Sequence, residues 1–136
     1  MTPVVVLLVE DNAGDALLTS QTLAEAPMPV KLHIARDGAQ ALQMLSVEQL
    51  KPDVVILDLS LPEVDGLRLM ERYHSGDVPI VVFSSSTKES DKLLAKALGG
   101  SEYIVKPTDL KAFREAIWGI VERWGGRKQN GMAATQ

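Results

Sequence analysis

Acidic residues directly follow two of the most apolar segments of the chain. Glu10 and Asp11 come after segment 4–9 (VVVLLV), and Asp58 comes after segment 54–57 (VVIL). Three carboxylates held close together repel one another, so one keeps a proton or a cation lies between them. Oxygen ligands of this kind suit magnesium, and a carboxylate beside such an ion can attack phosphorus to form an acyl phosphate.

A hydroxyl group and an ammonium group follow two further apolar segments. Ser84 comes after segment 80–83 (IVVF), and Lys106 comes after segment 103–105 (YIV). An ammonium group can offset the charge on phosphoryl oxygens during transfer, and a hydroxyl group can donate a hydrogen bond to the new phosphoryl group. These residue types are the ones needed for metal-assisted phosphoryl transfer to Asp58.

The apolar segments have the composition of β-strands. Three of them contain β-branched and aliphatic residues without alternation, as in strands buried on both faces. Segment 30–34 (VKLHI) alternates apolar and polar residues, which is typical of an edge strand. The five predicted strands are 4–9, 30–34, 54–57, 80–83 and 103–105.

A segment with helical spacing of apolar residues follows each predicted strand. The alternation predicts an α/β fold, a doubly wound parallel sheet with five flanking helices and the most apolar strands in the middle. Sites in such sheets lie outside the carboxyl ends of the strands. We therefore expect the acids, the serine and the lysine to meet at one edge of the sheet.

Length and composition indicate one domain. The chain has 136 residues, a net charge of −4, a pI near 5.1 and no cysteine. These values exclude thiolate sites and disfavour a surface that coats nucleic acid. Because no apolar run could span a bilayer and no secretory signal is visible, we expect a cytoplasmic protein. The folded domain is predicted over 1–125, its last helix ending at Gly125-Gly126, with a disordered tail over 126–136.

The motifs together resemble the receiver domain of two-component response regulators, and the resemblance covers about residues 4–124. They are Glu10-Asp11, Asp58 followed by 59–62 (LSLP), Asp65-Gly66, Ser84 and Lys106-Pro107. The resemblance implies a flavodoxin-like fold with strand order 2-1-3-4-5. Segment 9–15 (VEDNAGD), the LDLSLP stretch and the Trp-containing last helix are similar to stand-alone receivers associated with bacteriophytochrome-type kinases.

The resemblance implies a role for each acid. Asp58 would accept a phosphoryl group from the phosphohistidine of a sensor histidine kinase or phosphotransfer protein, or from a small phosphodonor. Mg²⁺ would be held by Asp11, Asp58 and the backbone carbonyl of Ser60, with Glu10 acting mainly through a bound water. The protein would then catalyse only its own phosphorylation and dephosphorylation.

The resemblance also implies a switch. Lys106 would contact the phosphate, Ser84 would supply the switch hydroxyl and Tyr103 the switch aromatic ring, and the Lys106–Pro107 bond would be cis. Because three serines are consecutive, Ser85 stays an alternative to Ser84. The output would be a partner surface or homodimer surface on the fourth helix, fifth strand and fifth helix, without an attached output domain or direct nucleic-acid contact.

Proteins of other functional classes have similar residues at the ends of parallel strands. A haloacid-dehalogenase-type phosphatase has an aspartate nucleophile after a parallel strand, but it needs a second acid two residues on, where this chain has Ser60. A flavodoxin-like flavin binder would suffer repulsion between its phosphate and Glu10-Asp11. A receiver that acts as a phosphorylation-independent scaffold is a third alternative. For Glu10 and Asp11 taken alone, capping of the following helix is an ordinary explanation.

Overall fold

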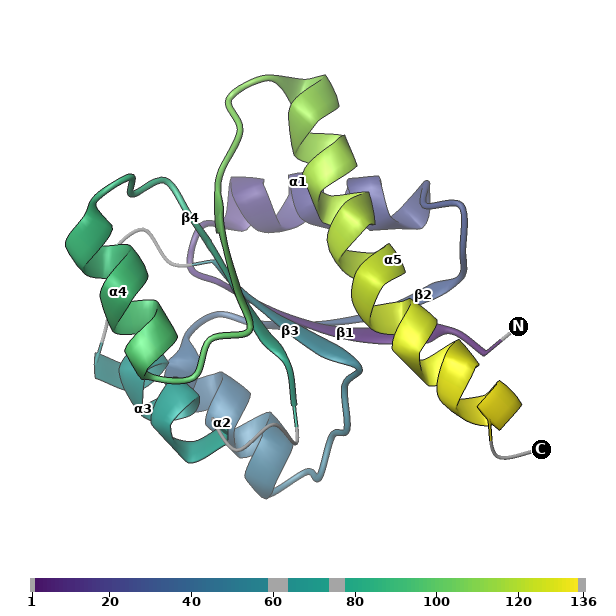
Figure 1. Cartoon of the computed structure of the whole chain (residues 1–136), viewed down its shortest axis with the longest axis horizontal. Coiled ribbons are helices and arrows are strands. Elements are labelled where there is room, and N and C mark those ends of the chain that lie inside the picture. Colours follow the sequence, from purple (N-terminus) through teal and green to yellow (C-terminus); the bar gives the residue numbers. More distant parts are fainter. Residues whose placement is uncertain (1, 59–63, 74–77, 135–136) are drawn as a thin grey trace.

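The computed structural model describes the backbone of residues 2–58, 64–73 and 78–134, and their side chains except those of 64–67, 73 and 126–134. Strands and helices alternate along the chain (Figure 1). The strands are β1 (Val4–Glu10), β2 (Val30–Ala35), β3 (Val54–Asp58), β4 (Ile80–Ser84) and β5 (Glu102–Val105). The helices are α1 (Ala13–Ala24), α2 (Gly38–Ser46), α3 (Val64–Tyr73), α4 (Glu89–Ala97) and α5 (Leu110–Ala134).

The five strands form one parallel sheet in the order β2-β1-β3-β4-β5, as predicted. Every residue of β3 is buried, whereas edge strand β2 is only partly buried. The register aligns the carboxyl ends of neighbouring strands: Glu10 lies opposite Asp58. The sheet therefore brings residues that are far apart in the sequence to one edge.

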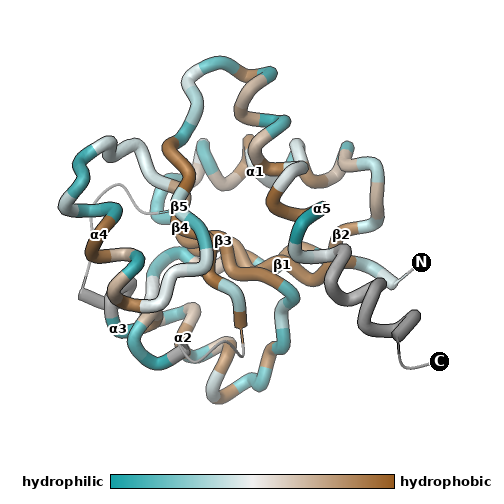
Figure 2. Tube along the Cα trace, viewed as in Figure 1, coloured by the Kyte–Doolittle hydropathy of each residue, from teal (hydrophilic) through white to brown (hydrophobic). Residues whose placement is uncertain are grey.

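Helices cover both faces of the sheet. In Figure 1, α1 and α5 lie on one side and α2, α3 and α4 on the other. Successive residues of a strand point to opposite faces, so Val6 and Leu8 of β1 join the core beside α5, while Leu7 and Val9 join the other core. Figure 2 shows that hydrophobic residues concentrate in the central strands. Among the described residues, none of the helices combines the length and the apolar character needed to cross a membrane.

Helix α5 does not end where the sequence predicted. The expected stop at Gly125-Gly126 is wrong, because α5 continues to Ala134. A Cβ atom at Gly125 would lie 2.4 Å from Cγ2 of the buried Val4, so this glycine allows α5 to approach the start of β1. Glycine weakens a helix by only about 1 kcal/mol, which packing can offset. The domain boundary at residue 125 and the disordered tail over 126–136 stay predictions, and residues 135–136 lie outside the described part.

Candidate functional site

Two buried carboxyl groups lie side by side at the ends of the central strands. Glu10 is the last residue of β1 and Asp58 the last residue of β3. The side chain of each is 1% exposed. Ionised carboxylates are costly to bury unless a cation or hydrogen-bond donor compensates them. The two acids therefore require a positive partner or a proton.

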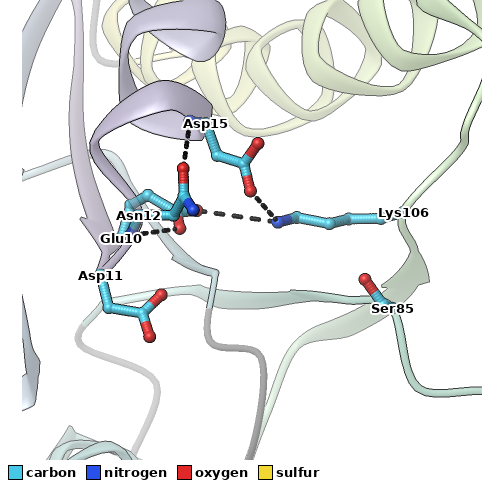
Figure 3. A pocket seen from close by; sticks show the side chains of 6 residues that line it. All are labelled: Glu10, Asp11, Asn12, Asp15, Ser85 and Lys106. Carbon is cyan, nitrogen blue, oxygen red and sulfur yellow. Dashed lines mark hydrogen bonds and ion pairs between the residues drawn. The ribbon is translucent and has the colours of Figure 1, made fainter.

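Lys106 supplies the positive partner. Its Nζ lies 2.6 Å from Oδ1 of Asp58 and 3.8 Å from Oε2 of Glu10. The backbone N–H of Lys106 donates to the carbonyl of Ser84, which extends the β4–β5 pairing by one residue and directs the lysine to this edge. Lys106 also contacts Asp15 of α1: Nζ donates to Oδ2 at 3.2 Å (Figure 3).

The cis geometry expected for the Lys106–Pro107 bond is wrong. This bond is trans, the isomer that X–Pro bonds favour by about 0.5–1 kcal/mol. The trans bond is compatible with the contact between Lys106 and Asp58, so the lysine reaches the acid without the turn that a cis bond would impose.

Helix capping does not account for the two acids after β1. The N-cap of α1 is Asn12, whose Oδ1 accepts the N–H of Asp15 at 2.9 Å. Glu10 instead accepts the N–H of Asn12 through Oε1 at 3.0 Å, which leaves its Oε2 facing Lys106. Because Asn12 caps the helix, the carboxylates of Glu10 and Asp11 remain available for another role.

The burial of this cluster changes its acid–base properties. Burial raises the pKa of Glu10 from 4.5 to about 9, and the neighbouring carboxyl group of Asp58 adds to the rise. Burial also raises the pKa of Asp58, although Glu10 and Lys106 partly offset it. Burial would lower the pKa of Lys106, but its contacts with Asp58 and Glu10 outweigh burial and raise it.

The buried oxygens suit a divalent cation. Within the described residues, Oε2 of Glu10 and both carboxylate oxygens of Asp58 accept no hydrogen bond, although Oδ1 of Asp58 has the ion pair with Lys106. A proton shared between Glu10 and Asp58 would satisfy two of these oxygens, and a cation could replace that proton. Carboxylate oxygens are the ligands that Mg²⁺ prefers.

The complete ligand set predicted for this cation is not assembled. In the part of the chain that the structure describes, no three histidine, cysteine or acidic side chains are grouped so that they could hold a metal ion. Asp11 is exposed, and in Figure 3 no interaction joins it to the other labelled residues. Ser60 and the side chain of Asp65 lie outside the described residues. The assignment of Glu10, Asp11, Asp58 and Ser60 as metal ligands therefore stays a prediction.

A pocket of about 210 Å³ opens at this edge of the sheet. Its lining residues are shown in Figure 3: Glu10, Asp11, Asn12, Asp15, Ser85 and Lys106. Ser85 lines the pocket, whereas Ser84 is buried and its Oγ accepts the N–H of Ser86 at 3.1 Å. Ser84 ends β4 and Ser85 follows it, and the choice between them as switch hydroxyl stays open.

Ser86 connects β5 to α4. The hydroxyl of Tyr103 donates to the carbonyl of Ser86 at 2.9 Å, and Oγ of Ser86 donates to Oδ2 of Asp91 at 2.5 Å. Neither this connection nor a role for Asp15 is among the predictions from the sequence. No local pattern indicates the role of Asp15, because its contact with Lys106 joins residues 91 positions apart in the sequence.

Comparisons with known proteins identify relatives that match most of this chain. The family profile described as "Response regulator receiver domain" matches residues 6–118. The response regulator Rcp1 of Synechocystis sp. is 30% identical over 131 residues, which span 90% of this chain and 89% of Rcp1. The crystal structure of the phosphorylated cyanobacterial phytochrome response regulator RcpA is similar with a TM-score of 0.79 and 31% identity, covering 90% of this chain and 94% of RcpA. The Mn²⁺-bound structure of Rcp1 has a TM-score of 0.76, 30% identity and the same coverage.

Proposed function

Because this chain belongs to the family of response regulator receiver domains, we propose that it is a phosphoacceptor in a two-component phosphorelay, with Asp58 as the acceptor. The observation that carries the proposal is the buried carboxylate of Asp58 with the ammonium of Lys106 at 2.6 Å. The donor would be the phosphohistidine of a cytoplasmic sensor kinase or phosphotransfer protein. Similarity to RcpA supports a kinase of the phytochrome type as the input.

In the proposed reaction, a carboxylate oxygen of Asp58 attacks phosphorus. The bond between phosphorus and the donor breaks, and the donor leaves with the electron pair. Lys106, already in contact with Asp58, can donate to a phosphoryl oxygen and reduce the charge that would otherwise accumulate beside Glu10. The protein modifies itself and does not turn over a substrate.

We assign the metal site of this reaction to Mg²⁺ held by Glu10, Asp11, Asp58 and the carbonyl of Ser60. The support is the pair of buried carboxyl groups with oxygens that accept no hydrogen bond from the described residues. When bound, the cation would neutralise the carboxylates and polarise the phosphoryl oxygens. Asp11 is exposed and lines the same pocket as Glu10.

The proposed output is a change on the surface formed by α4, β5 and α5. Phosphorylation adds about −1.5 to −2 charge beside Lys106. The hydroxyl of Ser84 or Ser85 would move toward the phosphoryl group and shift the loop that precedes α4. Because Tyr103 donates to Ser86 in this loop, the tyrosine would move with it. A downstream protein or a second copy of the chain would read the altered surface.

The test uses intact-mass spectrometry after incubation with Mg²⁺ and acetyl phosphate. We expect one phosphoryl adduct, which Asp58→Asn abolishes and Asp11→Ala slows greatly. Asp37→Asn makes the same chemical change at the N-cap of α2, where asparagine serves equally well, and should leave the adduct intact. An adduct that persists in Asp58→Asn would falsify the acceptor assignment. A wild-type protein without an adduct would favour the scaffold alternative, and continuous hydrolysis of a phosphomonoester such as p-nitrophenyl phosphate would favour the phosphatase.

The same assay decides between the two candidate switch hydroxyls. Ser84→Ala and Ser85→Ala each remove one hydroxyl group from adjacent positions, so each variant serves as the control for the other. We expect the switch serine to be the one whose loss leaves the adduct intact but removes the phosphorylation-dependent change in α4, followed by hydrogen exchange. An α4 response that survives in both variants would contradict a serine switch.

A further inference from the structure

Asp15 shares the ammonium of Lys106 with Asp58. Oδ2 of Asp15 accepts a hydrogen bond from Nζ at 3.2 Å, whereas Oδ1 of Asp58 lies at 2.6 Å from the same nitrogen. The side chain of Asp58 is 1% exposed and that of Asp15 is 47% exposed. The lysine thus contacts the proposed acceptor on its buried side and Asp15 on its solvent side.

The position of Asp15 is well defined. Its backbone N–H is bound by the N-cap residue Asn12, in the first turn of α1. Its carboxylate lines the pocket together with Glu10 and Asp11, and Lys106 is the cation in that lining (Figure 3). A phosphodonor that enters the pocket is therefore exposed to the charge of Asp15, whose side chain is 47% exposed, beside Lys106, whose side chain is 17% exposed.

We propose that Asp15 is a specificity-determining residue that slows the phosphorylation of Asp58 by small, free, anionic phosphodonors. The proposal rests on the function proposed above. With acetyl phosphate, the bond between phosphorus and the acetate oxygen breaks, phosphorus bonds to a carboxylate oxygen of Asp58, and acetate leaves with the electron pair. Asp15 does not touch the reacting atoms. It acts through its negative charge in the lining of the pocket and through its hydrogen bond with Lys106.

The physical reason is electrostatic repulsion without compensating binding energy. A small dianion offers few contacts that could offset the repulsion from Asp15, because the pocket is small and polar. A protein donor brings an interface whose contacts can offset the same cost. Asp15 therefore discriminates between free phosphodonors and a phosphorylated protein partner.

The test compares Asp15→Asn with the wild type, because this variant removes the charge and keeps the shape of the side chain. Initial rates of adduct formation are measured with acetyl phosphate, a dianion at neutral pH, and with the less charged phosphoramidate. At low ionic strength we expect Asp15→Asn to accelerate labelling by acetyl phosphate about three- to tenfold. The increase should be smaller with phosphoramidate, and it should shrink as salt is added.

A matched control removes the same charge from the other end of the same helix. Glu25 is the exposed C-cap residue of α1, about 15 Å from Asp15 along the helix axis. The control variant and Asp15→Asn are therefore also compared at physiological salt, where the Debye length of about 8 Å is shorter than this distance. Glu25→Gln should therefore leave both rates unchanged, and an equal acceleration in this variant would overturn the proposal.

Two other results would also overturn it: equal rates in Asp15→Asn and the wild type, or slower labelling in Asp15→Asn with either donor. If the variant does not fold, the wild type provides the test. Its labelling by acetyl phosphate must then rise with ionic strength more than its labelling by phosphoramidate. Failure of the proposed function looks different, since the wild type would then take no phosphoryl group or Asp58→Asn would take one.

Discussion

Helices α5 and α4 flank β5 but are attached to the sheet very differently. In α5, the apolar residues Phe113, Ile117, Ile120 and Val121 are all buried against the sheet. In α4, the buried residue is Ala95, while Leu93 is 60% exposed and Leu94 is 40% exposed. Because buried apolar area is the main source of attachment, α5 is held far more strongly than α4.

Polar contacts differ in the same way. Nε1 of Trp118 in α5 donates to the carbonyl of Thr22 at 2.8 Å and ties α5 to α1. The N-cap of α4 is Lys88, whose side chain makes no capping bond to the described residues. The first turn of α4 is connected to the rest of the protein through the contact between Asp91 and Ser86. This contact belongs to the loop beside the acidic cluster.

The difference indicates which side can respond to a change at Asp58. An element with little buried apolar surface opens at a lower free energy than a core element. Helix α4 follows the loop of Ser84 to Ser86, so a charge placed at the cluster acts first on the weakly attached helix. If Asp58 is phosphorylated as proposed, α5 would serve as the fixed reference against which α4 moves.

The largest expected effect is on core packing. Phe113→Ala should lower the free energy of unfolding by about 3–5 kcal/mol, because the ring is buried and packs against Phe83 with centroids 5.5 Å apart. Leu93→Ala should change it by less than about 0.5 kcal/mol, because Leu93 is exposed. Urea denaturation measures both. Equal costs would contradict the difference in attachment between α5 and α4.

The next effect concerns the acidic cluster and pH. The pKa of Glu10 is about 9 in the folded protein against 4.5 ordinarily, so the folded state holds its proton more tightly than the unfolded state. The stabilisation from this proton is present below pH 4.5 and is lost as pH rises toward 9. Without divalent cations, Glu10→Gln should therefore exceed the wild type in stability at pH 8 by about 1–2 kcal/mol.

Thermal and urea unfolding across pH 5 to 8, in chelator and in Mg²⁺, check this expectation. The wild type in chelator should lose stability with rising pH, and the Gln variant should show a flatter profile. Added Mg²⁺ should stabilise the wild type more than the variant. A wild-type profile as flat as that of Glu10→Gln would show that the buried acid does not hold a proton.

One hydrogen bond on each side of the sheet can be removed to compare the attachment of α5 with that of α4. Trp118→Phe removes the bond to Thr22, and Tyr103→Phe removes the bond to Ser86. Each should cost about 1 kcal/mol of stability. Hydrogen exchange should nevertheless accelerate in the first turn of α4 only for Tyr103→Phe. Faster exchange of α4 in Trp118→Phe would mean that the two sides are coupled more closely than their contacts indicate.

The smallest effect tests the contact that holds α4. Asp91→Asn keeps an acceptor for the Ser86 hydroxyl but removes its charge, whereas Glu89→Gln removes a charge from the same helical turn. Both lose a favourable interaction with the helix dipole. Asp91→Asn should cost about 0.5 kcal/mol more than Glu89→Gln, because charge-assisted hydrogen bonds are stronger. If urea titrations show that both variants lose the same free energy of unfolding, the contact between Asp91 and Ser86 is not what attaches α4 to the protein.

Much of the framework follows from local sequence patterns. The five apolar segments correspond to the five strands, and the polar alternation of 30–34 correctly indicated the edge position of β2. Composition and periodicity report burial, and burial determines which segments form the centre of a parallel sheet. Because parallel strands end at one edge, the proximity of Glu10, Asp58 and Lys106 could also be predicted.

Other features depend on packing between distant segments. The contact between Lys106 and Asp15 joins residues 91 positions apart, and no local pattern near either residue indicates it. Gly125 appeared to be a helix stop, but the approach of α5 to Val4 gives it a packing role. The cap of α1 is Asn12 and not the acids before it, and Oε2 of Glu10 instead lies 3.8 Å from Nζ of Lys106, which follows a strand distant in the sequence.

The sequence by itself therefore determined the strands, the central position of the most apolar ones and the edge at which the charged groups collect, and the family resemblance added the strand order. The tertiary structure decided which oxygen faces which nitrogen, which serine lines the pocket, and how firmly each helix is attached. The physical reason is the range of the interactions. Burial and backbone preference are properties of short segments, whereas hydrogen bonds and ion pairs require specific atoms within about 3–4 Å, a condition that only the packed chain meets.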